Sequence, residues 1–523
     1  MKKPLVKLEK IDFILLIILF SISAFFEIST FPKGIGIDEA LYWSETKDID
    51  PIHYYLGTSG QIPFHGPLFF YTNYFIVHIS NSLLAFRMPS LFFSFATILL
   101  FYIFAKALFN RKTAFIASLL LATSISFNII SIYRMPHIDY CFFSFASIFS
   151  FILALRTDEG KYLIISFLLA GIAFLINILG LTTLASLTLS LLVVKNNFIK
   201  FSKEKNSVKL KISKYTWIAL GTLILLILIC SPMQIIKGET IKRYNNTKNL
   251  IQTEKIMLHN PPFSLNFIRS VLFFERELSD IIIIIGIIAT VIITLKNKTL
   301  LPILIYLIIY SFIMSFTQGM MWYIVPVVMF TYLFFSRATF TITEQIFSKN
   351  IPINERKYAY ILTAMFIILT VLIVIMFNSK TTKNYYEITT HNNFPSYLYK
   401  EAYDYLKSKN ESGIYVLTNM GGLLRYYADK DGFNATFLEL PRSNLDFTLE
   451  DRNRLLPLSH HYYDYVVQLY RSTEEITNKS KLYATLQNIS SKCNHEVVLN
   501  NEKFNDPNTK LFIYNCKNMT LDN

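Results

Sequence analysis

Long apolar segments separated by short polar loops fill the chain from its start to residue 378. Each segment is long enough, or nearly so, to cross about 30 Å of hydrocarbon as a helix. This pattern predicts an α-helical polytopic membrane protein with about eleven transmembrane helices. The predicted segments are 11–31, 84–108, 113–133, 140–156, 162–177, 179–195, 215–233, 280–295, 299–317, 320–337 and 358–378.

From residue 379 the pattern changes to short stretches typical of strands, with helical stretches between them. Strands that alternate with helices predict a small α/β domain. We therefore expect two domains, a transmembrane domain over 1–378 and a C-terminal α/β domain over 379–523. The predicted strands are "GIYVLTN", "ATFLEL", "YDYVVQLY" and "KLFIYNC", and the predicted helices are "SYLYKEAYDYLKSK", "GGLLRYYADK" and "KLYATLQNISSKC".

The composition supports a membrane protein, because only 16% of the residues are charged, whereas soluble domains have about 25%. The formal net charge is +14, and Lys and Arg gather in the loops on the side of the N-terminus. Cytoplasmic loops have this bias, so the charge does not indicate nucleic acid, and no stacking or basic-stripe motif supports such a partner. We expect a multi-pass protein of the cytoplasmic (inner) membrane with a cytoplasmic N-terminus. An odd number of spans then places the C-terminal domain outside.

Two long loops and a cysteine pair fall on the predicted outer side. The loops cover about 32–83 and 234–279, and the second is basic, with Lys242 and Arg243 among its cations. Two interpretations of this charge are open: an anionic partner at the outer face, or no partner, because long loops translocate regardless of charge. Cys493 and Cys516 lie in the C-terminal domain and can pair if that domain is outside the cytoplasm.

Polar residues on the outer side gather in a few short segments that should lie at one depth. Asp38 and Glu39, which we expect to end the first helix, stand within "GIGIDEALYW". Charges beside membrane spans are costly and usually mark function. The segments predict a cavity that holds carboxylates, imidazoles, Arg and aromatic rings together. Its candidate residues are Asp38, Glu39, Tyr42, His65, Arg87, Arg134, His137, Asp139 and Tyr323.

This mixture suits the transfer of a group from a lipid-linked phosphate to an acceptor. A carboxylate can act as a general base, Arg and Lys bind phosphate, and aromatic rings stack on a sugar or a prenyl chain. Structural alternatives are open for several residues. Arg87 can be an interfacial anchor whose charged end reaches water, His137 can be structural, and Tyr323 can belong to an interfacial aromatic belt.

The order of these segments resembles that of a known family. The chain has "DEALYW", then "HGPLFFY", then "FRMPSLFFSFATILLFYIFAKALF", then "TAFIASLLLATSISFNIISIYRMPHID". The protein O-mannosyltransferase and aminoarabinose transferase superfamily consists of membrane glycosyltransferases of the GT-C fold. Its pattern is D-E-A-x-Y, then H-P-P-L or K-P-P-L, then R-L-P-S, then a short outer loop that ends in Asp. The resemblance covers residues 11–160 and continues more weakly through "MMWYIVP".

The resemblance implies that Asp38 is the general base or the carboxylate that orients the acceptor, and that Glu39 supports it. Asp139 would be the second acid of the pocket, and His65 and Arg87 would shape the site in the first loop. Basic residues of the loop 234–279, such as Lys242 and Arg243, would hold the phosphate of the donor.

Two departures from the family pattern change the expectations. Gly66 stands where the family has the first Pro of P-P-L, so we expect a looser turn there. His65 stands where the aminoarabinose branch has Lys, which favours the mannosyltransferase-like branch.

The sequence therefore predicts an inverting glycosyltransferase with a polyprenyl-phosphate sugar as donor and a glycan, a lipid such as lipid A, or a protein as acceptor. No cofactor is required, although the carboxylates can also bind a divalent cation. Two alternatives are a catalytically inactive receptor and a transporter or flippase of lipid-linked glycans, in which Asp139 and Arg134 form a gating pair. The lack of internal repeats disfavours the transporter.

Overall fold

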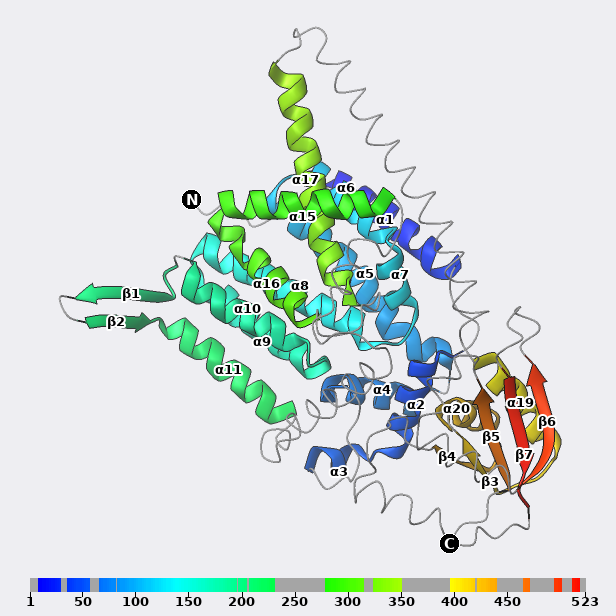
Figure 1. Ribbon diagram of the computed structural model, residues 1–523. Coiled ribbons are helices and arrows are strands. Elements are labelled where there is room, and N and C mark those ends of the chain that lie inside the picture. The colour runs from blue at the N-terminus through cyan, green and yellow to red at the C-terminus, as the bar shows by residue number, and fades with distance from the viewer. Residues whose placement is uncertain are drawn as a thin grey trace.

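The computed structural model describes residues 8–29, 35–56, 65–80, 82–194, 196–204, 207–230, 278–314, 323–349, 396–418, 421–439, 464–470, 493–500 and 510–517 (Figure 1). Most of these residues form one bundle of apolar helices. Its helices are α1 (Lys10–Ser29), α5 (Leu83–Leu108), α6 (Arg111–Ala122), α7 (Ile125–Ile132), α8 (Pro136–Thr157), α9 (Gly160–Ile176), α10 (Gly180–Val193), α11 (Lys214–Cys230), α15 (Leu278–Lys296), α16 (Leu301–Met314) and α17 (Val325–Lys349).

Each of the first ten predicted apolar segments coincides with a described helix or helix pair, which confirms a polytopic membrane protein. Among the described residues, four helices are long and apolar enough to cross a membrane, or up to five if a bent pair counts as one span. That pair is α6 and α7, which lie where the single segment 113–133 was predicted and meet at 61°. The total of about eleven spans stays a prediction, and the segment 358–378 lies outside the described residues.

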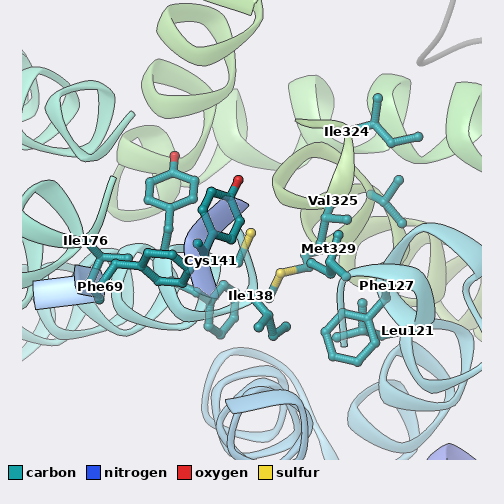
Figure 2. Packing of buried hydrophobic residues seen from close by; sticks show 14 of the residues in the cluster. Phe69, Leu121, Phe127, Ile138, Cys141, Ile176, Ile324, Val325 and Met329 are labelled. Atoms are coloured by element: carbon teal, nitrogen blue, oxygen red, sulfur yellow. The ribbon is translucent and has the colours of Figure 1, made fainter. Parts of the chain in front are cut away.

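Helix α8 runs through the middle of the buried core. Figure 2 shows apolar side chains of α4, α6, α7, α9 and α17 around Ile138 and Cys141 of α8. Both α8 residues are almost completely buried, as are most of their neighbours. Such close packing fixes the first turn of α8, which carries two of the predicted site residues.

The predicted loop 32–83 contains three helices, α2 (Ile37–Asp48), α3 (Pro51–Leu56) and α4 (Pro67–Ile79). The expectation that Asp38 and Glu39 end the first helix is therefore wrong, because α1 stops at Ser29 and both acids lie in the first turn of α2. Acids are favourable at this end of a helix, where backbone N–H groups are unpaired. Glu39 accepts a hydrogen bond from the N–H of the capping residue Gly36 at 2.9 Å, which fixes where α2 begins.

The C-terminal part holds a five-stranded mixed sheet with the strand order β4-β3-β5-β7-β6. The strands are β3 (Ile414–Thr418), β4 (Ala435–Glu439), β5 (Tyr465–Tyr470), β6 (Asn494–Asn500) and β7 (Lys510–Asn515), and the helices are α19 (Ser396–Ser408) and α20 (Gly421–Asp431). We call these elements the C-terminal α/β unit. The apolar side chains of β3, β5 and β7 that share a buried cluster with α19 and α20 belong to one face of the sheet.

Four strands and two helices of this unit lie where the sequence predicted them. Strand β6 and the hairpin of β1 (Ile199–Glu204) and β2 (Ser207–Ile212) were missed. The predicted helix "KLYATLQNISSKC" lies outside the described residues except for its last residue, and the domain boundary near 378 stays a prediction. Cys493 and Cys516 form a disulfide that joins the start of β6 to the end of β7.

Gly66 lies directly against the C-terminal end of α9. Its N–H donates a hydrogen bond to the carbonyl of Ile176 at 3.0 Å, and a Cβ atom at this position would lie 2.1 Å from the carbonyl oxygen of Leu175. Proline has no N–H to donate, and any side chain would collide with backbone. The expected looser turn is therefore wrong, because Gly66 makes a close backbone contact between α4 and α9.

Replacing Gly66 with Ala should lower the stability of the fold. The added Cβ forces α4 away from α9, and overpacking of this kind costs about 1–3 kcal/mol. Thermal unfolding of the purified protein in detergent measures the effect. Gly221→Ala is the matched control, since nothing lies within 4 Å of a Cβ at Gly221 in α11, and it should be neutral or stabilising. Equal unfolding temperatures for Gly66→Ala and the wild type would contradict the contact.

Candidate active site

Helix α2 carries the candidate residues on two neighbouring faces. Asp38 and Tyr42 are four residues apart and share one face, while Glu39 and Trp43 share the next. The first face borders α4, and the second borders α5 and α20. Asp38 is half-buried, whereas Glu39 and Trp43 are completely buried. The two adjacent acids therefore have different environments.

Glu39 is the acceptor at the centre of a buried hydrogen-bond network. Its Oε1 accepts from Arg87 Nε at 2.7 Å and from the backbone N–H of Arg134 at 2.7 Å. Its Oε2 accepts from Arg87 Nη2 at 2.5 Å and from the N–H of Gly36 at 2.9 Å. Glu39 and Arg87 are both 0% exposed. Each carboxylate oxygen thus has two donors, as a buried charge requires.

Arg134 connects three further elements to this network. Its Nε donates to Asn73 of α4 at 2.7 Å, and its Nη1 donates to Ser90 of α5 at 3.3 Å. Nη1 also forms an ion pair with Asp139 of α8 at 2.8 Å. The guanidinium lies over the ring of Phe69, 4.5 Å from the ring centroid. Nη2 is buried and has no hydrogen-bond partner among the described residues.

Asp139 is buried in the first turn of α8 and paired with Arg134. Sequence reasoning placed Asp139 and Arg134 at one depth, and the structure brings them into contact with each other. Asn73 and Ser90, which complete the shell around Arg134, were not among the predicted site residues. Ser90 belongs to the quoted "FRMPS" motif, whereas Asn73 is a neutral residue inside an apolar helix and gives no pattern in the sequence.

Aromatic rings and imidazoles line the other face of α2. The hydroxyl of Tyr42 is 2.8 Å from His65 Nε2. The rings of His65 and His137 lie 6.4 Å apart, and His137 packs edge-on against Tyr323 at 5.2 Å. The structure therefore brings together Tyr42, His65, His137 and Tyr323, which come from four separate parts of the chain.

The C-terminal α/β unit contributes Tyr426, which the sequence did not predict. Its ring packs edge-on against Trp43 at 5.2 Å, and it is 3% exposed. Burial raises the pKa of Tyr426 to about 12, the positive charge of Arg87 opposes this shift, and the negative charge of Glu39 adds to it. Tyr426 is therefore a neutral phenol beside the buried Glu39–Arg87 pair.

The remaining predictions for the site concern a metal and the donor phosphate. Within the part of the chain that the structure describes, no group of three His, Cys, Asp or Glu residues could hold a metal ion. Glu39 and Asp139 each already pair with an arginine. Lys242 and Arg243 lie outside the described residues, so their expected role at the phosphate stays a prediction.

A known family matches a part of the chain that includes His65, Arg87, Arg134, His137 and Asp139 and begins after α2. Residues 64–236 match the family model described as dolichyl-phosphate-mannose-protein mannosyltransferase. A search of curated proteins found no match.

Solved structures of membrane glycosyltransferases have a similar fold. ArnT from Cupriavidus metallidurans in the apo state is 11% identical, with a TM-score of 0.58 over 95% of this chain and 97% of ArnT. ArnT bound to undecaprenyl phosphate is 12% identical, with a TM-score of 0.55 and the same coverage. The oligosaccharyltransferase AglB from Archaeoglobus fulgidus, in complex with an inhibitory peptide and a dolichol-phosphate, is 13% identical, with a TM-score of 0.53 over 98% of this chain and 75% of AglB.

At sequence identities of 11–13%, the similarity to the solved structures shows a shared fold. The family match over residues 64–236 shows a similarity in the sequence as well. Together they confirm the resemblance that the motifs indicated. The chain is a polytopic membrane protein with the GT-C fold, and its residues 64–236 are similar to the dolichyl-phosphate-mannose-protein mannosyltransferase family.

Proposed function

We propose that the protein is an inverting glycosyltransferase that moves a sugar from a polyprenyl phosphate to an acceptor at the outer face of the membrane. The observation that carries the proposal is the environment of Asp38. Asp38 is half-buried in the first turn of α2. Its neighbour Glu39 is fixed there by hydrogen bonds from the side chain of Arg87 and from the backbone N–H of Arg134. The match over residues 64–236 supports the reaction class, and ArnT bound to undecaprenyl phosphate supports the donor class.

In the proposed reaction Asp38 is the general base. An acceptor hydroxyl attacks C1 of the sugar from the side opposite the phosphate, and its proton goes to the Asp38 carboxylate. The bond between C1 and the phosphate oxygen breaks, and its electron pair leaves with the polyprenyl phosphate. One displacement inverts the configuration at C1.

The leaving phosphate needs cations and hydrogen-bond donors. Arg134 Nη2 is a buried donor without a partner among the described residues, and such groups are rare because they are costly. A phosphate oxygen of the donor would satisfy it, with Lys242 and Arg243 as further cations. No metal is required in this scheme, because the cations meet the charge of a monophosphate.

The aromatic face of α2 would hold the sugar. Tyr42 and His65 can donate or accept hydrogen bonds, and His137 and Tyr323 form an adjacent edge-on ring pair. Rings of this kind suit a sugar, which presents C–H groups to their faces and hydroxyls to their polar atoms. The branch indicated by His65 is the mannosyltransferase-like one.

The loops and the disulfide support the outer side of the membrane for the site. The site lies at the end of the bundle where α2, packed against α4, meets the C-terminal α/β unit (Figure 1). That unit contains the Cys493–Cys516 disulfide, and disulfides form in oxidising compartments outside the cytoplasm. The basic loops near the N-terminus favour the opposite, cytoplasmic side for the other end.

Asp38→Asn should abolish transfer and leave the fold intact. Loss of a general base lowers the rate by about 10²–10⁴-fold, while loss of an acid from the first turn of a helix costs about 1 kcal/mol or less. Transfer of a radiolabelled sugar from a polyprenyl-phosphate donor measures the rate, and thermal unfolding in detergent serves as the control. A folded Asp38→Asn protein with the wild-type rate would contradict the mechanism.

Glu39→Gln, unlike Asp38→Asn, should lower the stability of the fold. It leaves Arg87 buried without a counter-charge, which costs about 3–5 kcal/mol. Urea or thermal unfolding in detergent measures the change in the free energy of unfolding. Glu9→Gln is the control, because the Glu9 side chain is 60% exposed in its pair with Arg111 and such pairs contribute about 1 kcal/mol or less. Similar small losses in both variants would show that the buried pair does not hold α2.

A further inference from the structure

The C-terminal α/β unit packs on the helix that carries Asp38, and the indole of Trp43 lies in this contact. Trp43 of α2 is completely buried. It packs edge-on against Phe86 of α5 at 5.2 Å and against Tyr426 of α20 at 5.2 Å. Helix α20 lies beside α2 (Figure 1). This contact therefore joins a membrane helix, the site helix and the C-terminal unit.

Tyr426 also lies near the Glu39–Arg87 ion pair. Trp43, which its ring contacts, stands four residues after Glu39 in α2. The other ring partner of Trp43, Phe86, directly precedes Arg87. The charges of Arg87 and Glu39 act in opposite directions on the pKa of the Tyr426 phenol. A buried, neutral ring at this point keeps water away from the pair, and the attraction between two charges is stronger where water is excluded. Removing the ring would hydrate the pair and weaken the hold on the first turn of α2.

Two adjacent tyrosines of α20 have different partners. The ring of Tyr426 packs against Trp43 of α2, whereas Tyr427 stacks on Tyr403 of α19 at 5.7 Å, inside the C-terminal unit. The hydroxyl of Tyr403 donates to Asp431 at the end of α20 at 3.0 Å. Tyr426 is thus the one of the two that contacts α2 through its ring.

We propose that Tyr426 is a positioning residue for the transfer reaction, and that the C-terminal α/β unit must be docked on Trp43 for α2 to hold Asp38 in place. The inference rests on the proposed function. Under this proposal, the geometry of the site depends on α2 and on the C-terminal α/β unit together.

Tyr426→Ala tests the coupling, with Tyr427→Ala as its matched control on the same helix. Both variants remove a buried tyrosine of α20, but Tyr427 packs inside the C-terminal unit, on Tyr403. The chain has three tryptophans, so Trp217→Phe and Trp322→Phe leave Trp43 as the only one. Acrylamide quenching of Trp43 then reports the docked contact without any assay of activity.

In that background we expect Tyr426→Ala to raise the quenching constant about twofold or more and to lower kcat about tenfold, because small misplacement of a reacting group is costly. The KM for the donor should stay within about twofold, since three of the four rings proposed to hold the sugar, those of His65, His137 and Tyr323, lie outside α2. Tyr426→Phe should restore both quantities, because the ring is the part that packs. Tyr427→Ala should leave the quenching of Trp43 and kcat near the values of the background protein.

Two results would overturn the inference. One is an exposed Trp43 in Tyr426→Ala with an unchanged kcat. The other is an equal loss of kcat in Tyr427→Ala, which would mean that general stability of the C-terminal unit matters and the contact does not. A wild-type protein with a protected Trp43 and no transfer activity would instead refute the proposed function, with the docked contact upheld.

Discussion

The geometry of the site depends on the buried ion pair of Glu39 and Arg87. Removing two charges from water is costly, and a buried pair is tolerated only when its remaining hydrogen-bonding groups are satisfied. Glu39 meets that condition with four donors on its two oxygens. Two of these donors are backbone N–H groups, so the carboxylate fixes the main chain at the start of α2 and at the start of α8. Losing one partner would leave the other buried without compensation.

The rest of the site follows from this constraint. Once Glu39 is anchored, the helical period turns the preceding residue, Asp38, toward a different and more accessible face. The same period places Trp43 under Tyr426 and Tyr42 beside His65. Two adjacent acids in the sequence thus have separate environments: Glu39 is buried in an ion pair, and Asp38 is the half-buried acid that we propose as the base. Arg134 extends the network to α4, α5 and α8.

Much of this could be predicted from the sequence, because hydrophobic period and motif order are local. The apolar segments, four strands of the C-terminal unit and the residues around Glu39 were all found in that way. The three helices in the first loop were missed. Helices α2 and α3 are short and lack a strong apolar stripe, and α4 is apolar but has only 13 residues, too few to be predicted as a membrane span. The role of Gly66 and the contact of Tyr426 with Trp43 were missed because they join segments far apart in the chain, and no local pattern records such a contact.

The central claim is that Glu39 and Arg87 act as one unit that positions Asp38, and that Glu39 does not itself move a proton. A double-mutant cycle on the single-turnover rate of sugar transfer tests it, with the wild type, Glu39→Gln, Arg87→Gln and the double variant. If the two residues act as one unit, the double variant loses about as much rate as either single variant. If the double variant loses the product of the two single effects, Glu39 and Arg87 act independently and the claim is contradicted.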